Sequence, residues 1–325
     1  MAKRGQQITP LYRPTPVLRI SAILRSVISV LRLKRYFPAA AIASIAVLVG
    51  SCMSWEPGWN EHRIVAGAHD PSGLWARSRQ QMNSADTRET LAALLSTYEA
   101  ILAAYPDSRE ALTSLGSYYT LMGAAYSQGR AQKARDYTKA IRYCERAMYL
   151  NPEFKALVDR GESVWDASRV LTAGDADAMG YWVTAVLYYF KEVVPDPLKI
   201  FDSGWLTRTR AVMERIETVM PNWSGGANYF NLGIYYLAAP KAMGGDLEKT
   251  SQYFAKARAA GPDWLLTPWG RAKYLDPLTG DKEAFRSDLG WLLTRDPRAS
   301  GTPYPWSIYF QRDGRALLAQ IDELF

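Results

Sequence analysis

Apolar residues recur with helical spacing through most of the chain from residue 86 onward. The first stripe has members at i, i+3, i+4 and i+7, which predicts one amphipathic helix. Its members are Leu91, Leu94, Leu95, Tyr98, Ile101, Leu102 and Tyr105. Asp86, with Glu89 three residues later, predicts the N-cap of this helix. Pro106-Asp107 predicts both its end and the cap of the helix that follows.

Several further segments have the same periodicity. Amphipathic helices are predicted over residues 132–150, 207–219, 281–294 and 314–325. Asn151-Pro152 ends one helix and starts another, because proline is tolerated in the first helical turn. The apolar and aromatic segment Asp175–Val193 predicts a buried helix, since it is too short and too polar at its ends to span a bilayer. No segment has a strongly strand-like pattern.

Small and aromatic residues repeat along these helices with the spacing of tetratricopeptide (TPR) hairpins. The most complete copy matches at Leu112, Leu115, Gly116 and Tyr119 in its first helix and at Ala140, Cys144, Ala147 and Pro152 in its second. Another copy matches at Leu232, Gly233, Tyr236, Thr250, Phe254, Ala257 and Pro262, and a half copy ends at Pro106. Each glycine is expected to let the two helices approach closely. The pattern predicts an all-α, TPR-like helical-hairpin solenoid, a single domain of about 11 to 13 helices.

Near the N-terminus, residues 38–51 form a short, uncharged and mostly apolar stretch after a basic segment. It is shorter than the about 20 residues that a spanning helix needs, and its features are typical of a secretory signal peptide. Val49-Gly50-Ser51-Cys52 resembles a bacterial lipobox. The resemblance implies cleavage before Cys52 and lipid attachment to its thiol, and several acyl chains make a firm anchor. The alternative is an uncleaved signal-anchor helix.

The chain is therefore predicted to comprise three parts: residues 1–51, a basic leader and cleaved signal peptide; residues 52–85, a tether; and residues 86–325, the helical domain. The leader is unusually long. Its residues 17–35 have a basic amphipathic pattern that fits a membrane surface, although translation from a downstream start is the favoured explanation. Within the tether, Trp55 and Trp59 allow the alternative of a short packed segment.

The charge distribution argues against binding to nucleic acid. The net charge is +7, but the first 51 residues contain eight Lys and Arg and no acid. The remaining residues contain 31 bases and 32 acids, so the body lacks the basic surface that polyphosphates require. Two cysteines and two histidines also exclude a disulfide framework and an ordinary multi-His or multi-Cys metal site. No cofactor is expected.

Candidate catalytic residues are few, and no enzymatic activity is predicted. The sequence has no nucleophile elbow, P-loop, dinucleotide-binding motif or zinc-protease motif. Cys144 occupies a helix-packing position, which predicts a small buried residue. Gly244-Gly245-Asp246 predicts a helix-helix turn capped by Asp246. His62 and His69 are predicted to be solvated residues of the tether.

Aromatic residues are abundant throughout the body, and two interpretations stand. One is an aromatic core. The other is an apolar cavity or partner groove, in which tyrosine supplies apolar area and a hydroxyl that fixes orientation. The groove candidates are Tyr118, Tyr119, Trp182, Tyr188, Tyr189, Tyr229, Tyr235 and Tyr236.

Four segments resemble those of a known family. Residues 228–240, ending at a proline, are followed by Met243-Gly-Gly-Asp246 and then by Gln252-Tyr-Phe-Ala-Lys-Ala257. This succession, and the closing segment Ala316-Leu-Leu-x-x-Ile-Asp-Glu-Leu-Phe325, are similar to the TatT lipoproteins associated with tripartite TRAP transporters. The resemblance extends over roughly residues 90–325, and the lipobox agrees with it.

The resemblance implies a lipid-anchored scaffold that faces the periplasm, docks a periplasmic solute-binding protein and takes a small hydrophobic ligand. It also implies a homotrimer as one oligomeric state that family members form. Met53 after the lipid-bearing cysteine favours the outer over the inner membrane. The alternative function is that of a general TPR lipoprotein in cell-envelope assembly, which acts through protein contacts alone.

Overall fold

The computed structural model describes residues 53–60 and 72–325, and all of them belong to one compact unit, Ser51–Phe325. The predicted leader, Cys52, His62 and His69 lie outside the described residues. Within the described ranges the regular structure is helical and contains no strand, so the all-α prediction is confirmed. None of the described helices has the length and apolar character needed to cross a membrane.

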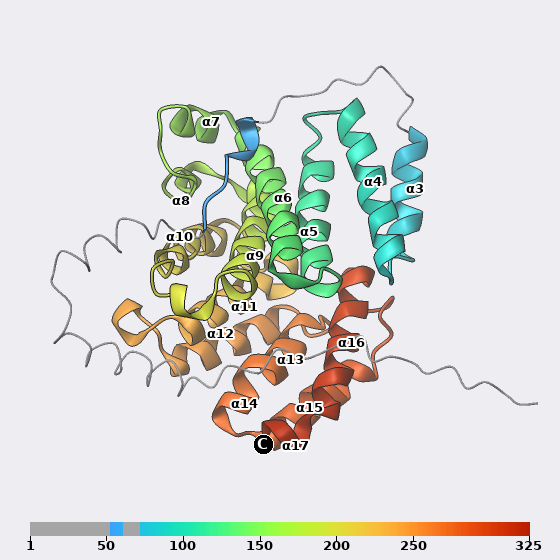
Figure 1. Cartoon of the computed structure of the whole chain (residues 1–325), viewed down its shortest axis with the longest axis vertical. Helices are drawn as coiled ribbons and strands as arrows, with labels where there is room; N and C mark the ends of the chain where they lie inside the picture. Colours follow the sequence, from blue (N-terminus) through green and yellow to red (C-terminus); the bar gives the residue numbers. More distant parts are fainter. Residues whose placement is uncertain (1–52, 61–71) are drawn as a thin grey trace, which may run out of the picture. The chain divides into compact units, whose positions relative to one another are not determined.

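The α-helices follow one another along the chain with short connections (Figure 1). They are α3 (Ser72–Met82), α4 (Arg88–Ala104), α5 (Arg109–Ala125), α6 (Gly129–Tyr149), α7 (Pro152–Val158), α8 (Val164–Ala167), α9 (Ala176–Glu192), α10 (Gly204–Val219), α11 (Trp223–Ala238), α12 (Leu247–Ala260), α13 (Leu266–Gly270), α14 (Asp276–Thr279), α15 (Lys282–Leu293), α16 (Tyr304–Ala319) and α17 (Ile321–Leu324).

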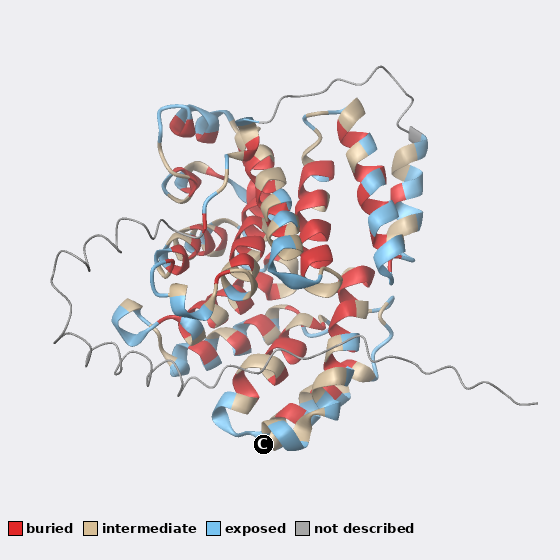
Figure 2. Cartoon of the chain, viewed as in Figure 1, coloured by how far each residue is buried: buried red, intermediate tan, exposed pale blue. Residues whose placement is uncertain are grey.

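Consecutive long helices pack side by side in the order α3, α4, α5, α6, α9, α10, α11 and α12. The hairpins α5–α6 and α11–α12 form the two most extensive helix interfaces. Helix α9, the predicted buried helix, contacts α5, α6, α10 and α11, and Figure 2 shows buried residues concentrated on these helices. This arrangement is compatible with a helical solenoid in a single domain.

Glycines set the close approach within both hairpins, as the repeat pattern predicts. A Cβ on Gly116 of α5 would lie 2.3 Å from the Sγ of Cys144 on α6. A Cβ on Gly233 of α11 would lie 2.5 Å from the ring of Phe254 on α12. Real Cβ atoms do not come so near another heavy atom, so only glycine fits either position. Cys144 is fully buried there, as predicted.

The predicted caps are partly right. Asn151 and Asp246 cap α7 and α12 as expected. Helix α4 instead begins after Thr87, whose side chain accepts from the amide of Thr90 in a capping box, and α5 begins after Ser108. The expected caps at Asp86 and Asp107 were therefore wrong by one residue. In the first case the capping box uses two threonine hydroxyls, while the carboxylate of Asp86 accepts from Tyr304.

The last long helix starts earlier than residue 314, where the sequence pattern placed it. Helix α16 begins at Tyr304, just after Pro303, and Pro305 fits its first turn. Its N-terminal half carries buried aromatic side chains, and the indole of Trp306 donates to the hydroxyl of Ser117 on α5 at 3.0 Å. The aromatic residues pack this half against α5 and α13, so the chain returns to the first hairpin.

Residues 53–60, called the strap below, pack against the helical body. Met53 is buried, and residues 58–60 form a short 3-10 helix (η2) beside α6. Trp55 and Trp59 both pack on the core, which confirms the alternative of a short packed segment. Residues 72–82, also inside the range predicted as a tether, form helix α3, which packs on α4.

Candidate functional site

The two hairpins each contain a stacked pair of tyrosines at equivalent positions. In the first, Tyr119 of α5 stacks on Tyr143 of α6, with ring centroids 5.8 Å apart and planes at 18°. In the second, Tyr236 of α11 stacks on Tyr253 of α12, at 5.4 Å and 15°. Offset stacking of this kind adds about 0.5–1.5 kcal/mol beyond burial. The repeat that is visible in the sequence therefore includes a repeated surface feature.

Charged groups surround each tyrosine stack in the same way. The Nζ of Lys139 lies 4.6 Å from the ring centroid of Tyr119, and the Nζ of Lys249 lies 5.2 Å from that of Tyr236. An acid of the preceding helix accepts from one tyrosine of each pair. These bonds run from Tyr119 to Glu99 of α4 at 2.5 Å and from Tyr253 to Glu217 of α10 at 3.4 Å.

Burial and the neighbouring carboxylates keep these phenols protonated. The pKa of Tyr119 is raised first by burial and then by its hydrogen bond to Glu99. The pKa of Tyr253 is raised to about 12, again mainly by burial, with Glu217 as the next cause. Both hydroxyls therefore act as hydrogen-bond donors at neutral pH, which suits the fixing of a neighbour's orientation.

A groove opens beside the first stack, between the start of α4, the end of α5 and the start of α6. Its volume is about 280 Å³. The lining is partly apolar and partly charged: Arg88, Ala92, Leu95, Ser96, Tyr119, Met122, Ser127, Gln132, Arg135 and Asp136. Arg88 and Arg135 are exposed and form no ion pair with a described residue. The groove thus combines an apolar floor with two free guanidinium groups.

The corresponding end of the second hairpin is filled by its own residues. Glu99 of α4 and Glu217 of α10 are equivalent, because each accepts a hydrogen bond from a tyrosine stack. Seven residues before them lie Ala92 and Arg210, so Arg210 of α10 corresponds to Ala92 of α4. Its guanidinium lies 5.8 Å from the ring centroid of Tyr236 and pairs with Glu214 at 2.7 Å. The loop 239–246 also folds over this end, where the hydroxyl of Tyr235 donates to the carbonyl of Met243 at 2.5 Å.

The eight aromatic residues predicted for a groove are distributed over several places. Tyr119 lines the groove described above, and Tyr236 occupies the equivalent place in the second hairpin. Tyr229 packs near Tyr253, Tyr118 stacks on Tyr98, and Tyr188 lies near Tyr137. Trp182 and Tyr235 are buried, and Tyr189 contacts the strap through Trp55. Whether they bind a ligand remains a prediction, and Tyr119 is the member at an open groove.

The strap is held by a buried carboxylate, Glu145 of α6. One oxygen accepts from the indole nitrogens of Trp55 at 2.8 Å and Trp182 at 3.2 Å. The other accepts from the backbone amide of Gly58 at 2.8 Å. Gly58 lies so close to α6 that a Cβ would be 1.9 Å from the backbone carbonyl oxygen of Arg142. Three donors from two segments therefore converge on one side chain.

Burial raises the pKa of Glu145 to about 7, and the hydrogen bonds from Trp55 and Gly58 oppose that rise. A carboxyl group in an apolar setting resists ionisation because the charged form loses its hydration. The carboxyl group thus titrates near neutral pH while it holds the strap.

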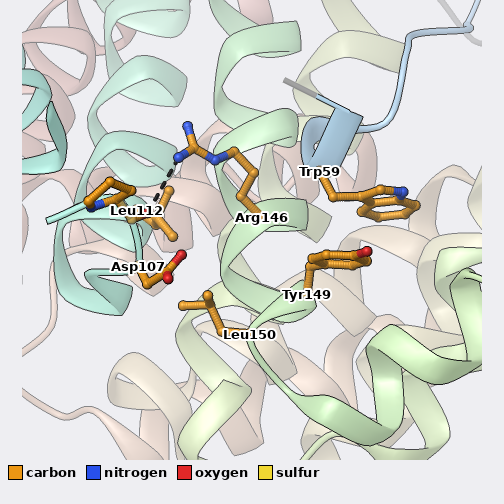
Figure 3. A pocket seen from close by; sticks show the side chains of 7 residues that line it. Trp59, Asp107, Leu112, Arg146, Tyr149 and Leu150 are labelled. Atoms are coloured by element: carbon orange, nitrogen blue, oxygen red, sulfur yellow. Dashed lines mark hydrogen bonds between the residues drawn. The ribbon is translucent and has the colours of Figure 1, made fainter. Parts of the chain in front are cut away.

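Aromatic stacking completes the strap contact at its far end. Trp59 stacks on Tyr149 of α6 at 5.5 Å and 9° (Figure 3). It also meets Phe154 of α7 edge-on at 6.3 Å. Figure 3 also shows Arg146 reaching the carbonyl of Pro106, a contact of 3.4 Å. The cavity among these residues has room for about 10 Å³, roughly one water-sized sphere. This region is a packed joint, and the open groove lies at the other end of the hairpin.

No direct signal for several of these residues is visible in the sequence. Glu99, Lys139 and Tyr143 are recognised as parts of a repeated tyrosine cluster only when the two hairpins are compared with their glycines aligned. Among the described residues, no cluster of three or more His, Cys, Asp or Glu has the arrangement of a metal site.

Comparison with known proteins identifies the family of the chain. The comparison with curated proteins found no match. The family model of the TRAP transporter T-component (TAtT) matches residues 86–325, which is well over half of the chain and includes both hairpins. The protein therefore belongs to the TRAP transporter T-component family.

Proposed function

We propose that this T-component is a lipid-anchored, periplasm-facing scaffold that docks a solute-binding protein in the groove between α4, α5 and α6. Family membership supports a role in a TRAP transport system and an association with the bacterial cell envelope. The groove is the single observation that carries the docking site, because it is the place where a tyrosine stack found in both hairpins lies beside open space.

The chemistry of the groove favours a partner with an acidic and apolar surface. Leu95, Met122 and Tyr119 are 4 to 7% exposed and give the groove a small apolar surface, while Arg88 and Arg135 are exposed and form no ion pair with a described residue. Arginine and tyrosine are enriched at binding hot spots because they combine large contact area with directed hydrogen bonds. A carboxylate of the partner would satisfy the free guanidinium groups through charge-assisted bonds.

A small hydrophobic ligand is the second part of the proposal. The groove volume of about 280 Å³ is close to the lower end of ligand pockets, which measure about 300–1,000 Å³. The groove therefore suits one end of an apolar molecule that a docked partner covers from the other side.

The proposal of a lipid anchor rests on the sequence around Cys52. The apolar stretch 38–51, the lipobox and the basic leader support acylation of Cys52 after signal-peptide cleavage. We place the protein at the outer membrane because Met53 follows the acylated residue. Family membership favours this transport role over the alternative of a general envelope-assembly lipoprotein.

The experiment is a binding titration between the full-length protein in detergent and the solute-binding protein of the same TRAP system. Ala92→Arg copies the residue that fills the second hairpin, so we expect it to weaken binding at least tenfold. Ala255→Arg, at another exposed helical alanine, is the matched control and is expected to bind normally. Equal binding by both variants would rule out the groove, and no binding by the unmodified protein would rule out this partner.

Native mass spectrometry of the same preparation tests the remaining parts. It reports the number of subunits, for which we propose a homotrimer, and the mass of any small molecule that copurifies.

A further inference from the structure

The loop between α9 and α10 presents the two most exposed large apolar side chains of the described residues. Ile200 is 63% and Phe201 is 62% exposed. Both lie just before α10, where Trp205 is largely buried. Large apolar side chains that are this exposed and adjacent commonly mark a surface that something covers.

The surroundings of this loop resemble those of residues at a membrane-water interface. The guanidinium of Arg208 packs on two neighbouring indoles, 4.5 Å from the ring centroid of Trp165 and 4.6 Å from that of Trp205. Arg208 forms no ion pair with a described residue. Lys199, beside Ile200, pairs with Asp196 at 2.8 Å. Neighbouring aromatic and basic side chains suit the lipid headgroup region, where the rings contact acyl chains and the charges meet phosphates.

The N-terminal end of the strap lies beside the start of α10, the helix that follows this loop. Its Trp55 lies 4.7 Å from Trp205 between ring centroids, and Figure 1 shows the strap running along α6 and ending next to α10. Met53 is only 1% exposed, so the chain is packed on the body up to the residue that follows Cys52. Two residues lie between Cys52 and Trp55, and the three steps along the chain limit the distance between their Cα atoms to about 11 Å. Acyl chains on Cys52 would therefore start near the first turn of α10, which directly follows the α9–α10 loop.

We propose that Ile200 and Phe201 insert into the bilayer surface beside the acylated Cys52. The strap and this loop would together fix the orientation of the helical body relative to the membrane. This inference rests on the proposed acylation of Cys52. The occupant is a phospholipid surface, because the covalent anchor brings lipid to this side of the body. The groove is lined by residues of α4, α5 and α6 and by Ser127, and it contains no residue of the α9–α10 loop.

The test places an environment-sensitive fluorophore at residue 201. Full-length Phe201→Cys protein is labelled with a thiol-reactive nitrobenzoxadiazole dye and reconstituted into vesicles of phosphatidylethanolamine and phosphatidylglycerol that contain nitroxide-labelled lipid. Cys144 is fully buried and does not compete for the label. We expect a blue-shifted emission and at least twofold quenching by the nitroxide lipid. Leu278→Cys on α14, which is 43% exposed, is the control and is expected to remain unquenched.

Mass spectrometry of the same samples separates the possible failures. Acylated protein without quenching at residue 201 overturns the loop insertion and leaves the anchor intact. The absence of acyl chains on Cys52 would overturn both the lipid anchor and the insertion of the loop. If the label is shielded only when the solute-binding protein is added, the loop contacts a protein, and the lipid proposal is wrong.

Discussion

The hairpins α5–α6 and α11–α12 share one packing scheme and differ in what covers them. Both place a glycine against a buried side chain of the partner helix, and both carry a tyrosine stack with a lysine over it. In the second hairpin Arg210 and the loop 239–246 fill the end of the stack. In the first hairpin that end is an open groove, and the outer side of α6 is covered by the strap.

Glu145 and its counterpart show the difference most clearly. The residue in the equivalent position of α12 is Ala255, which is exposed to solvent. In α6 the same position is buried under the strap and α9, and a carboxylate there receives three hydrogen bonds. A repeat can thus keep its internal packing and acquire a specific joint through one substitution on its outer face.

The largest expected effect comes from removing that joint. Glu145→Ala leaves three buried donors without an acceptor and creates a cavity, so we expect a loss of about 3 kcal/mol in the free energy of unfolding. Ala255→Glu, the reverse change in the second hairpin, is expected to alter it by no more than about 0.5 kcal/mol because the site is exposed. Urea denaturation followed by circular dichroism measures both. Similar losses in the two variants would contradict the distinction.

The next effect concerns the glycines that both hairpins share. Gly116→Ala and Gly233→Ala each force a methyl group against a buried side chain, and we expect a loss of about 1–3 kcal/mol from each. Gly290 of α15 has open space around its Cβ position, so Gly290→Ala is expected to stabilise the protein by about 0.5–1 kcal/mol. Thermal melts of the three variants test this order. A neutral Gly116→Ala variant would show that the helices approach less closely.

The pH dependence of stability is a third, more graded test of the joint. The pKa of Glu145 is about 7 in the folded protein, above its ordinary value of 4.5. The folded state therefore binds more protons than the unfolded state between these values, and the contribution of Glu145 to stability falls as pH rises from about 4.5 to about 7. Glu145→Gln should lack this component. Identical slopes of unfolding free energy against pH in both proteins would show that Glu145 does not titrate in this range.

The smallest expected effect separates the two tyrosine stacks. The hydroxyl of Tyr119 donates to Glu99 and accepts from Lys139 at 3.0 Å, so Tyr119→Phe should cost about 1 kcal/mol. No hydrogen bond of the Tyr236 hydroxyl to a described residue is found, so Tyr236→Phe should be nearly neutral. Chemical denaturation of both variants provides the comparison. Equal costs would place both hydroxyls in the same environment.

The sequence predicted those features that depend on neighbours in the chain. Helical periodicity located α9, the glycine spacing identified the close contacts at Gly116 and Gly233, and Asn151 and Asp246 were recognised as caps. The capping box at Thr87 was missed because Asp86 is an equally good cap by sequence.

Features that depend on long-range packing could not be predicted in this way. Glu145 has the pattern of an exposed helical residue, and it is buried by two distant segments, the strap about 90 residues earlier and α9. The groove likewise depends on Ala92 being small where the second hairpin has Arg210. That comparison requires the acids Glu99 and Glu217 to be aligned in space.

The most direct test of the docking site is crosslinking in living cells. A photoreactive benzoylphenylalanine replaces either Ser96, which lines the groove, or Glu214, its counterpart beside the second stack. We expect irradiation to join the solute-binding protein of the TRAP system to the residue at 96 and not to the residue at 214. Crosslinks from 214 alone, or none from 96 while the two proteins still copurify, would contradict docking in the groove.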